Sequence, residues 1–405
     1  MKKVCVVGLG YIGLPTASLL ANKDFQVYGV DCVEYVVDTI NEGKIHIVEK
    51  GLSDFVEQAV RSGNLKAGLE PVEADVFIIA VPTPFKEGKK PDLSYVENAA
   101  KEIAPYVNEG NIIILESTSP IGTTERISQW IAQERKDLNI NNIFFAHCPE
   151  RVLPGKIIEE LSKNDRIIGG VNKESTERTV EFYKCFVEGD LLKTDARTAE
   201  LSKLTENAFR DVNIAFANEL SMICDKLDIN VWELIKLANR HPRVNILQPG
   251  PGVGGHCIAV DPWFIVDSAP EESNLISTAR NVNDKKTSYV IAQVRKAIKK
   301  YKKPVVACLG LAFKPDIDDL RESPAMKIVK ELAQSENSEL LVVEPNIIGL
   351  PDSLAIYENL KFVDLDTAIQ RANIVVLLVD HKTFKGLDEK MFLNKILIDT
   401  RGTFK

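Results

Sequence analysis

The seven cysteines of this 405-residue chain are scattered, and no two of them form a Cys-x-x-Cys pair. That spacing excludes the common cysteine zinc sites and gives no sign of a disulfide framework, so we expect no metal. The chain also lacks a basic excess. Its formal net charge of −8 argues against nucleic acid as the main partner. No apolar run reaches transmembrane length, so no membrane association is expected.

The opening MKKVCVVGLG lacks the features of a signal peptide, because a strand begins at once. We therefore expect a cytoplasmic protein whose thiols stay reduced. Hydrophobic residues make up 45% of the chain and charged residues 27%, which is typical of a globular protein with two or three domains at this length. An anionic substrate has to be held by local Lys, Arg and backbone N–H groups.

The stretch QPGPGVGGHCIAVDPWF, residues 248–264, holds four glycines and two prolines before Cys257. Neither a helix nor a strand tolerates that density, so we predict a shaped loop whose backbone lies close to a ligand. The stretch lacks the Gly-Lys-Ser/Thr ending of a phosphate-binding loop. What it presents is a thiol, with Asp261 four residues on. Cys257 is the candidate nucleophile, whereas the other cysteines are expected to be small buried residues.

A dinucleotide fingerprint occupies the start of the chain. The strand KVCVV is followed by GLGYIG and then by the helical pattern LPTASLLAN. A second strand, residues 25–31, ends in Asp31, whose carboxylate would bind ribose hydroxyls and repel a 2′-phosphate. The pattern therefore favours NAD over NADP, with a glycine turn in another α/β fold as the alternative. The predicted cofactor residues here are Gly8, Gly10, Tyr11, Ile12, Gly13 and Asp31.

Strand and helix patterns then alternate, which predicts a doubly wound sheet. Because ligands gather at the carboxyl ends of such strands, we expect Thr83, Thr118 and Glu150 at the mouth of the site. The two threonines could instead cap turns, and Glu150 could form an ion pair with Arg151. The fold class is α/β, with an N-terminal Rossmann domain over residues 1–195.

An unbroken helical pattern over residues 198–227 predicts the long spine helix of a central all-helical domain, residues 196–300. Lys203, Asn207 and Arg210 share one face of this helix, and its apolar residues predict a homodimer. A second Rossmann-like domain follows over residues 301–405, where Gly310 is not part of a dinucleotide fingerprint. Lys314 and Arg321 stand after its first strand as candidates for binding anionic groups, although Arg321 could simply pair with Asp318 or Asp319.

The chain resembles the nucleotide-sugar 6-dehydrogenase family, which includes UDP-glucose and GDP-mannose dehydrogenases. The likeness rests on the segments GLGYIGLP, VPTP, ESTSPIGTT, CPERVLPG, KLTENAFRDVNIAFANEL, GPGVGGHCIAVDP and GLAFKPDIDDLRESPA and covers essentially the whole chain. It implies a UDP-sugar substrate whose C6 alcohol is oxidised to the uronate in two NAD-dependent steps. The product of such a reaction is used for bacterial surface polysaccharides.

The resemblance also implies roles for individual residues. Cys257 would be the nucleophile with Asp261 in acid/base work, Lys203 and Asn207 would stabilise oxyanions, and Glu150 and Thr118 would serve the aldehyde, thioester and water steps. Thr83, Thr118 and Arg321 would add to the cofactor site. The implied substrate-binding residues are Glu150, Arg151, Lys203, Asn207, Arg210, Arg243, Gly252, Gly254, His256 and Lys314, with Arg243 crossing into the partner subunit's site.

Two departures concern the sugar. UDP-glucose dehydrogenases carry a second acid shortly after the Glu150 position, where this chain has VLPG with Pro154, and a serine where it has His256. Both differences suit an N-acetylated sugar. The segment HPRVNILQPGPGVGGHCIAVDPWFIV most resembles the members of the family that act on UDP-N-acetyl-D-mannosamine, so the resemblance implies that sugar, with UDP-N-acetylglucosamine and UDP-glucose as alternatives. Two other functions stay open. One is a two-electron β-hydroxyacid-type dehydrogenase, which would not need Cys257, and the other is a catalytically silent NAD sensor or scaffold.

Overall fold

The computed structural model describes residues 2–153, 155–334 and 338–404, so Pro154 lies outside the described residues. The chain divides into two compact units. The first comprises Met1–Glu206 with Trp263–Ala269, and the second comprises Asn207–Pro262 with Pro270–Lys405. Each unit is taken by itself below.

The first unit is built on a sheet in the order β3-β2-β1-β4-β5-β6-β7-β8. Its strand pairs are parallel except for β6 and β7, which run antiparallel. The bounds are β1 (Lys3–Val7), β2 (Gln26–Val30), β3 (Leu65–Gly68), β4 (Val76–Ile79), β5 (Ile112–Leu115), β6 (Phe144–His147), β7 (Arg166–Gly170) and β8 (Leu191–Asp195). The order reverses between β1 and β4, which is the point where doubly wound sheets bind ligands.

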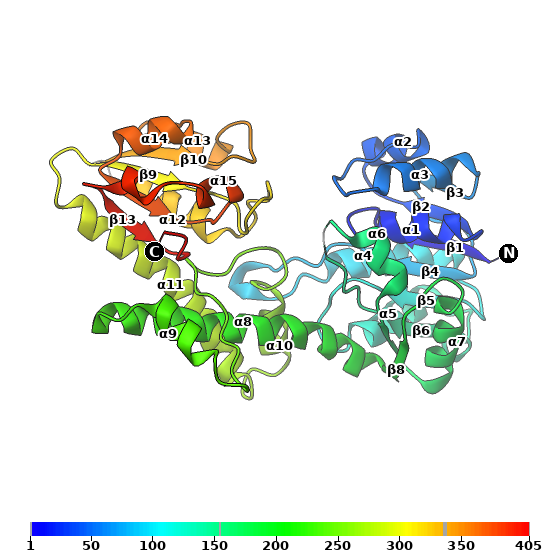
Figure 1. Cartoon of the computed structure of the whole chain (residues 1–405). Helices are drawn as coiled ribbons and strands as arrows, with labels where there is room; N and C mark the ends of the chain where they lie inside the picture. The colour runs from blue at the N-terminus through cyan, green and yellow to red at the C-terminus, as the bar shows by residue number, and fades with distance from the viewer. Residues whose placement is uncertain (1, 154, 335–337, 405) are drawn as a thin grey trace. The chain divides into compact units, whose positions relative to one another are not determined.

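Helices cover both faces of this sheet (Figure 1). Alternate residues of each central strand enter different cores, because successive side chains of a strand point to opposite faces. Val4, Ile78 and Ile114 pack in one core, and Cys5, Phe77 and Ile113 pack in the other. The helices are α1 (Gly13–Asn22), α2 (Glu34–Asn41), α3 (Leu52–Arg61), α4 (Ser94–Ile103), α5 (Thr123–Glu134), α6 (Ile157–Lys163) and α7 (Lys173–Tyr183), with 3₁₀ turns η1 (Glu87–Lys89), η2 (Ala104–Tyr106) and η3 (Ile140–Asn142).

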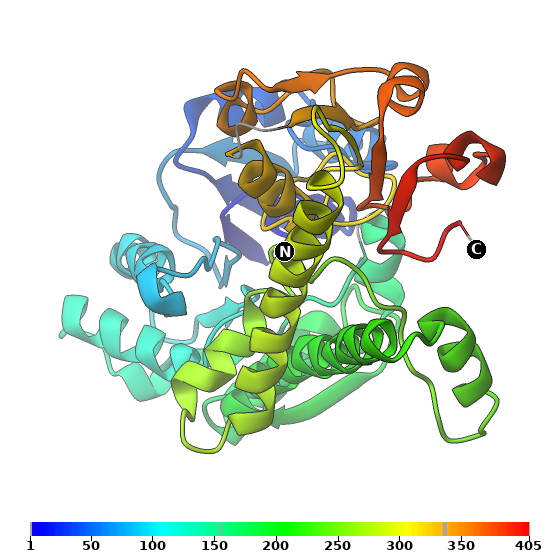
Figure 2. The ribbon, with the colours of Figure 1, turned by 90° about the vertical axis from the view of Figure 1, so that its left-hand side faces the viewer.

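The predicted spine helix is α8 (Ala196–Leu227), which runs for 32 residues. In the second unit α11 (Asn274–Ile298) lies beside it, as both views show (Figures 1 and 2). Buried polar side chains join the two helices: Arg280 donates to Asp211 at 2.6 Å, and Lys286 donates to Ser221 at 2.7 Å. The shorter helix α9 (Val231–Ala238) begins after Asn230, whose side chain accepts hydrogen bonds from the first turn.

The second sheet is parallel throughout, in the order β11-β10-β9-β12-β13. One face packs against α11 and α12 and the other against α14 and α15, again with alternating strand residues. The bounds are β9 (Val305–Leu309), α12 (Pro324–Ala333), β10 (Glu339–Val343), α13 (Asp352–Ala355), β11 (Leu360–Phe362), α14 (Leu365–Arg371), β12 (Ile374–Leu377), α15 (Lys382–Lys385), η4 (Glu389–Phe392) and β13 (Ile396–Asp399). The predicted fold class is confirmed.

The prediction of a loop over residues 248–264 is wrong for its last four residues, which begin α10 (Asp261–Ser268). Pro262, the second residue of α10, is tolerated in the first turn because the N–H that a proline lacks has no intrahelical acceptor there. An aspartate is also favourable at that end of the helix dipole. The glycines all precede this turn, so the loop ends where Asp261 begins the helix. None of the described helices is long and apolar enough to cross a bilayer.

Candidate active site

The turn between β1 and α1 has the backbone shape that a bound pyrophosphate requires. Gly8 has a φ of 90°, and a Cβ on Gly13 would lie 1.7 Å from the Gly8 carbonyl oxygen, so both positions need glycine. By contrast, a Cβ on Gly10 would meet no atom of the described chain within 4 Å. The N-terminus of α1 is not capped by the side chain of Ile12. This open cradle fits phosphate groups, with Tyr11 exposed at its rim.

Asp31, directly after β2, lies beside the same turn. Its Oδ2 accepts a hydrogen bond of 3.0 Å from the Leu9 N–H, and its Oδ1 accepts one of 3.0 Å from the Val33 N–H. The side chain is only half-buried, so the carboxylate keeps a face for ribose hydroxyls. The cradle and this acid together fit a nicotinamide dinucleotide without a 2′-phosphate.

The loops after β4 and β5 are tied together at the carboxyl edge of the first sheet. The Thr83 hydroxyl donates a hydrogen bond of 2.5 Å to the Thr118 carbonyl, and the Ser117 hydroxyl donates one of 2.7 Å to the Val81 carbonyl. Thr83 therefore bridges two loops rather than capping its own turn. Both threonines are half-buried, which leaves them accessible to a ligand at this edge.

Glu150, after β6, is buried and paired with Arg166, not with the neighbouring arginine. Its Oε2 lies 2.5 Å from Arg166 Nη1, and its Oε1 accepts from the Arg151 N–H at 2.7 Å. The Arg151 side chain instead pairs with Glu206 at 2.8 Å. The alternative of a Glu150–Arg151 side-chain pair is therefore wrong. Sequence reasoning missed Arg166, although an arginine opening the apolar strand RIIGG is a signal for a buried partner.

The first turns of α8 are anchored on the loop that carries Thr118. Glu200 is fully buried and accepts hydrogen bonds from the Gly122 and Thr124 N–H groups at 2.5 and 2.8 Å, so it caps α5. Lys203, half-buried, follows one turn later. Burial lowers the pKa of His147, at the end of β6, to about 3, and the Lys203 ammonium acts in the same direction.

In the second unit, Asn207 and Asp261 are in direct contact. The Asn207 amide donates to Asp261 Oδ2 at 2.5 Å, and Asp261 is buried. The N–H groups of Val260 and Asp261 both donate to the Cys257 carbonyl, at 2.9 and 2.8 Å. This tight turn places the half-buried Cys257 four residues before the start of α10. The structure therefore joins three of the predicted catalytic residues through two contacts.

The loop before Cys257 is pinned by side chains and by the segment after β9. The Gly250 N–H donates to Asn218 Oδ1 at 2.8 Å, and Thr287 donates to the Pro251 carbonyl at 2.9 Å. A Cβ on Gly255 would lie 2.8 Å from the Phe313 ring, at a φ of 86°. Gly252 and Gly254 pack equally closely on Thr287, Glu322 and Pro324. The glycines therefore serve the packing of the loop within this unit.

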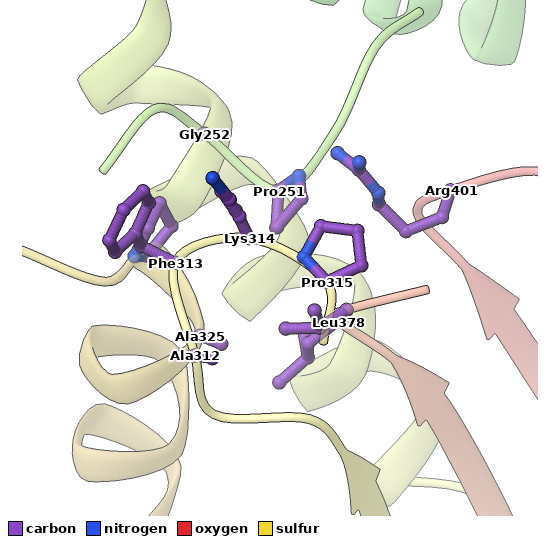
Figure 3. A pocket seen from close by; sticks show the side chains of 11 residues that line it. Pro251, Gly252, Ala312, Phe313, Lys314, Pro315, Ala325, Leu378 and Arg401 are labelled. Carbon is purple, nitrogen blue, oxygen red and sulfur yellow. The ribbon is translucent and has the colours of Figure 1, made fainter. Parts of the chain in front are cut away.

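A shallow pocket lies between this loop and the ends of the second sheet. Lys314 and Arg401 approach it from either side of Pro251 (Figure 3). Arg401 is oriented by Asp380, whose Oδ1 accepts from Arg401 Nε at 2.8 Å. Two cations at one pocket suit an anionic group. Sequence reasoning found Lys314 but missed Arg401, which stands in a C-terminal segment without any motif.

The remaining predicted residues lie on exposed surface. Arg210 and Arg243 are exposed. Arg321 pairs with Asp319 at 2.6 Å, as the alternative for this residue states. The His256 side chain, 52% exposed, lies 3.9 Å from the same Asp319, and its pKa is lowered by partial loss of solvent on its covered side and by the charge of Arg321. His256 is therefore neutral at pH 7.

Three family models match the chain in succession. They describe the NAD binding domain (residues 2–187), the central domain (197–285) and the UDP binding domain (307–405) of one family. The chain belongs to the UDP-glucose/GDP-mannose dehydrogenase family. The resemblance seen in the sequence is confirmed, and so is the expected cofactor, NAD. These matches identify an NAD-dependent dehydrogenase of a UDP-sugar. They do not support the two other functions that the sequence left open, a catalytically silent NAD sensor or scaffold and a two-electron β-hydroxyacid-type dehydrogenase.

Two individual relatives and one solved structure are similar to this chain over nearly their whole length. The UDP-N-acetyl-D-mannosamine dehydrogenase of Campylobacter jejuni is 60% identical over 95% of this chain and 96% of its own length. The NDP-N-acetyl-D-galactosaminuronic acid dehydrogenase of Ralstonia nicotianae is 57% identical over 99% of this chain and 96% of its own length. Among solved structures, the UDP-N-acetyl-mannosamine dehydrogenase Cap5O of Staphylococcus aureus is 44% identical, with a TM-score of 0.88, over 100% of this chain and 96% of that one.

Proposed function

We propose that this family member is a UDP-N-acetyl-D-mannosamine 6-dehydrogenase that forms UDP-N-acetyl-D-mannosaminuronate for surface polysaccharide synthesis. The observation that carries the chemistry is the turn that joins Cys257 to Asp261, with Asn207 bonded to that carboxylate. Support for the sugar comes from the relative of Campylobacter jejuni, 60% identical, and from the solved Staphylococcus aureus enzyme. His256 and the absence of a second acid after Glu150 agree with an N-acetylated sugar.

The first oxidation removes a hydride from C6 and a proton from its hydroxyl. When bound, NAD accepts the hydride in each of the two oxidation steps. Asp261 takes the hydroxyl proton as the general base. The Cys257 thiolate then adds to the aldehyde carbon, so that a hemithioacetal replaces a product that would otherwise hydrate and escape. Loss of the second hydride, together with the hydroxyl proton of the hemithioacetal, which Asp261 takes as base, leaves a thioester on Cys257.

Hydrolysis of the thioester releases the uronate and restores the thiol. Glu150, set by Arg166, and Thr118 orient the attacking water, and Lys203 and Asn207 stabilise the oxyanions. Each donor to such an oxyanion is worth about 3–4 kcal/mol in the transition state. Gly8, Gly10, Tyr11, Ile12, Gly13 and Asp31 would hold the cofactor, with Thr83 and Arg321 also assigned to it.

The nucleotide half of the substrate would occupy the pocket of Lys314 and Arg401, whose charges match a diphosphate. Arg151, Arg210, Gly252, Gly254 and His256 would line the rest of the substrate site. Each of these assignments extends the family likeness to a matching position of this chain.

We also infer a homodimer in the cytoplasm. In the part of α8 that belongs to the second unit, four large apolar side chains are exposed at spacings of seven, seven and four residues, which places them on one helix face. They are Phe209, Phe216, Ile223 and Leu227, exposed by 70%, 52%, 46% and 60%. A second copy would cover this stripe, and Arg243 would reach the partner's site. We also infer that the NAD-binding, central and nucleotide-sugar-binding domains meet near residues 195 and 300, as predicted from the sequence.

A second candidate substrate is a UDP-N-acetyl-D-galactosamine-type sugar, because the Ralstonia nicotianae relative is 57% identical over nearly its whole length. The two sugars differ in the orientation of single hydroxyl and acetamido groups, which a few pocket contacts distinguish.

The deciding experiment is a panel of UDP-sugars assayed for NADH release by the purified protein. The expected result is the highest kcat/KM with UDP-N-acetyl-D-mannosamine, by at least tenfold over UDP-N-acetylglucosamine, UDP-N-acetylgalactosamine and UDP-glucose. A higher value with the galacto sugar would assign the second function. Turnover of UDP-glucose alone would refute both.

A further inference from the structure

The segment that carries Phe313 and Lys314 is held at both ends by two buried side chains. Glu344, directly after β10, is 2% exposed. Its Oε2 accepts hydrogen bonds from the N–H groups of Leu311 and Ala312, at 2.7 and 3.0 Å. This carboxylate fixes the first half of the segment.

His381, after β12, fixes the other end and is fully buried. Its Nδ1 lies 2.9 Å from the Asp316 N–H, so that nitrogen is an acceptor and the ring proton is on Nε2. The Nε2 proton then points at Glu344 Oε2, 3.0 Å away. The imidazole therefore links the carboxylate to the far end of the segment. Asp316 has a φ of 61°, an uncommon backbone conformation for a residue other than glycine, and the contact to His381 stabilises it.

Glu344 occupies the place that Asp31 has in the first sheet. Both follow the second strand of a Rossmann-like unit, and both accept from an N–H in the turn after the first strand. Asp31 is half-buried and open to a ligand. Glu344, by contrast, is closed off by His381 and by Asn346, whose N–H and side-chain amide each lie 3.1 Å from its Oε1. At this position of the fold, Asp31 of the first sheet is open to a ribose, whereas Glu344 of the second sheet supports the backbone of the neighbouring segment.

We propose that His381 and Glu344 are positioning residues that shape the Phe313–Lys314 segment for the nucleotide half of the substrate. The proposal rests on the proposed function of the Lys314 pocket. The Lys314 side chain is exposed. Its position therefore depends on how its backbone is held by the buried groups of the segment. Asp380, the residue before His381, orients the second cation of the pocket, because its Oδ1 accepts a hydrogen bond of 2.8 Å from Arg401 Nε.

Two conservative variants separate the two contacts of His381. The amide of His381→Asn reaches about as far as Nδ1 and can still accept from the Asp316 N–H. The amide of His381→Gln reaches about as far as Nε2 and can still donate to Glu344. His381→Leu loses both contacts. A matched control is Phe384→Leu, because the Phe384 ring packs against His381, with ring centroids 5.4 Å apart, but makes no polar contact with the segment.

The measurements are the Kd of UDP by calorimetry and the steady-state constants with the UDP-sugar and NAD. His381→Leu is expected to weaken UDP binding at least tenfold and to raise the KM of the UDP-sugar in parallel, with kcat and the KM of NAD within twofold. His381→Asn should recover most of the affinity. Phe384→Leu should lower Tm without changing the Kd of UDP.

The proposal is overturned if folded His381→Leu binds UDP within twofold of the wild type, or if Phe384→Leu loses as much affinity as His381→Leu. If His381→Leu does not fold, Glu344→Gln and the Asn and Gln variants carry the same test, and unchanged UDP affinity in all three overturns it. Lys314→Ala tests the pocket assignment separately. If the wild type oxidises its sugar and Lys314→Ala still binds UDP with wild-type affinity, the assignment of this pocket to the nucleotide is wrong.

Discussion

The amide of Asn207 donates a hydrogen bond of 2.5 Å to the carboxylate of Asp261, across 54 residues of sequence. One residue lies on the long helix α8 and the other begins α10, immediately after the loop that carries Cys257. The bond orients the Asp261 carboxylate from the side of α8. Under the proposed mechanism the same Asn207 amide also stabilises the oxyanions.

Replacing Asn207 with alanine is therefore expected to lower kcat about 100-fold, the effect typical of one lost oxyanion donor, with the KM of NAD within twofold. Asn213→Ala is the control, because that amide donates to the Phe209 carbonyl one turn back on the same helix. Steady-state rates with saturating UDP-sugar measure the effect. An Asn207→Ala enzyme with wild-type kcat would remove Asn207 from the catalytic set.

Cofactor choice depends on the charge of Asp31. The change Asp31→Asn keeps an acceptor for the Leu9 N–H but removes the charge that repels a 2′-phosphate. We expect the ratio of kcat/KM for NAD to that for NADP to fall at least tenfold. The neighbouring exposed Cys32→Ser should leave the ratio unchanged. An unchanged ratio in Asp31→Asn would mean that another group selects the cofactor.

Glu116 predicts a pH dependence of stability. It is 2% exposed, accepts from the Tyr183 hydroxyl at 2.6 Å, and burial raises its pKa from 4.5 to about 7 against the opposing charge of Arg166. Between these values the unfolded chain releases a proton that the folded chain keeps, so stability falls as pH rises. The penalty is complete above pH 7 and amounts to about 3 kcal/mol at most.

Glu116→Gln removes this titration while its amide oxygen can still accept from Tyr183. The difference in unfolding free energy between this variant and the wild type should therefore shift in favour of the variant from pH 5 to pH 8. Urea titrations at both pH values measure it, and the exposed Glu181→Gln serves as control. A difference that does not change with pH would contradict the raised pKa of Glu116.

The apolar stripe of α8 predicts the oligomeric state. Placing two glutamates in it, Phe209→Glu with Phe216→Glu, should convert a dimer into a folded monomer, because the charges cannot be buried unpaired. Ile348→Glu, at a fully exposed position away from the stripe, should remain dimeric. Light scattering with circular dichroism distinguishes these outcomes. A monomeric wild type, or a dimeric double variant, would contradict the assigned interface.

Much of the fold could be predicted because its signals are local. Apolar runs such as KVCVV and IVVL became buried central strands, and the periodicity of residues 198–227 became α8. The short edge strands β3 and β8 went unpredicted because LKAG and LLKTD are half-exposed and look like loops. The start of α10 was missed because the glycines before it dominate the local pattern.

The site could be predicted where a motif implies its own chemistry, and not where a partner comes from a distant element. Cys257, Asp31 and Lys314 stand in recognisable segments. Arg166, Arg401 and His381 act through contacts 16 to 65 residues away, and no spacing rule reports such a pair. Glu150 shows the consequence: the sequence suggested its neighbour as a partner, and the fold supplied an arginine from the next strand.

The number of NADH molecules released per sugar shows whether the Cys257 sulfur holds the sugar between two oxidations. Wild-type enzyme given limiting UDP-sugar should release two NADH for each uronate formed. Cys257→Ala, with cofactor binding intact, should form no uronate and release at most one NADH per sugar, with aldehyde trapped by a hydrazine. Uronate production by Cys257→Ala at near wild-type rate, or one NADH per sugar in the wild type, would contradict the account.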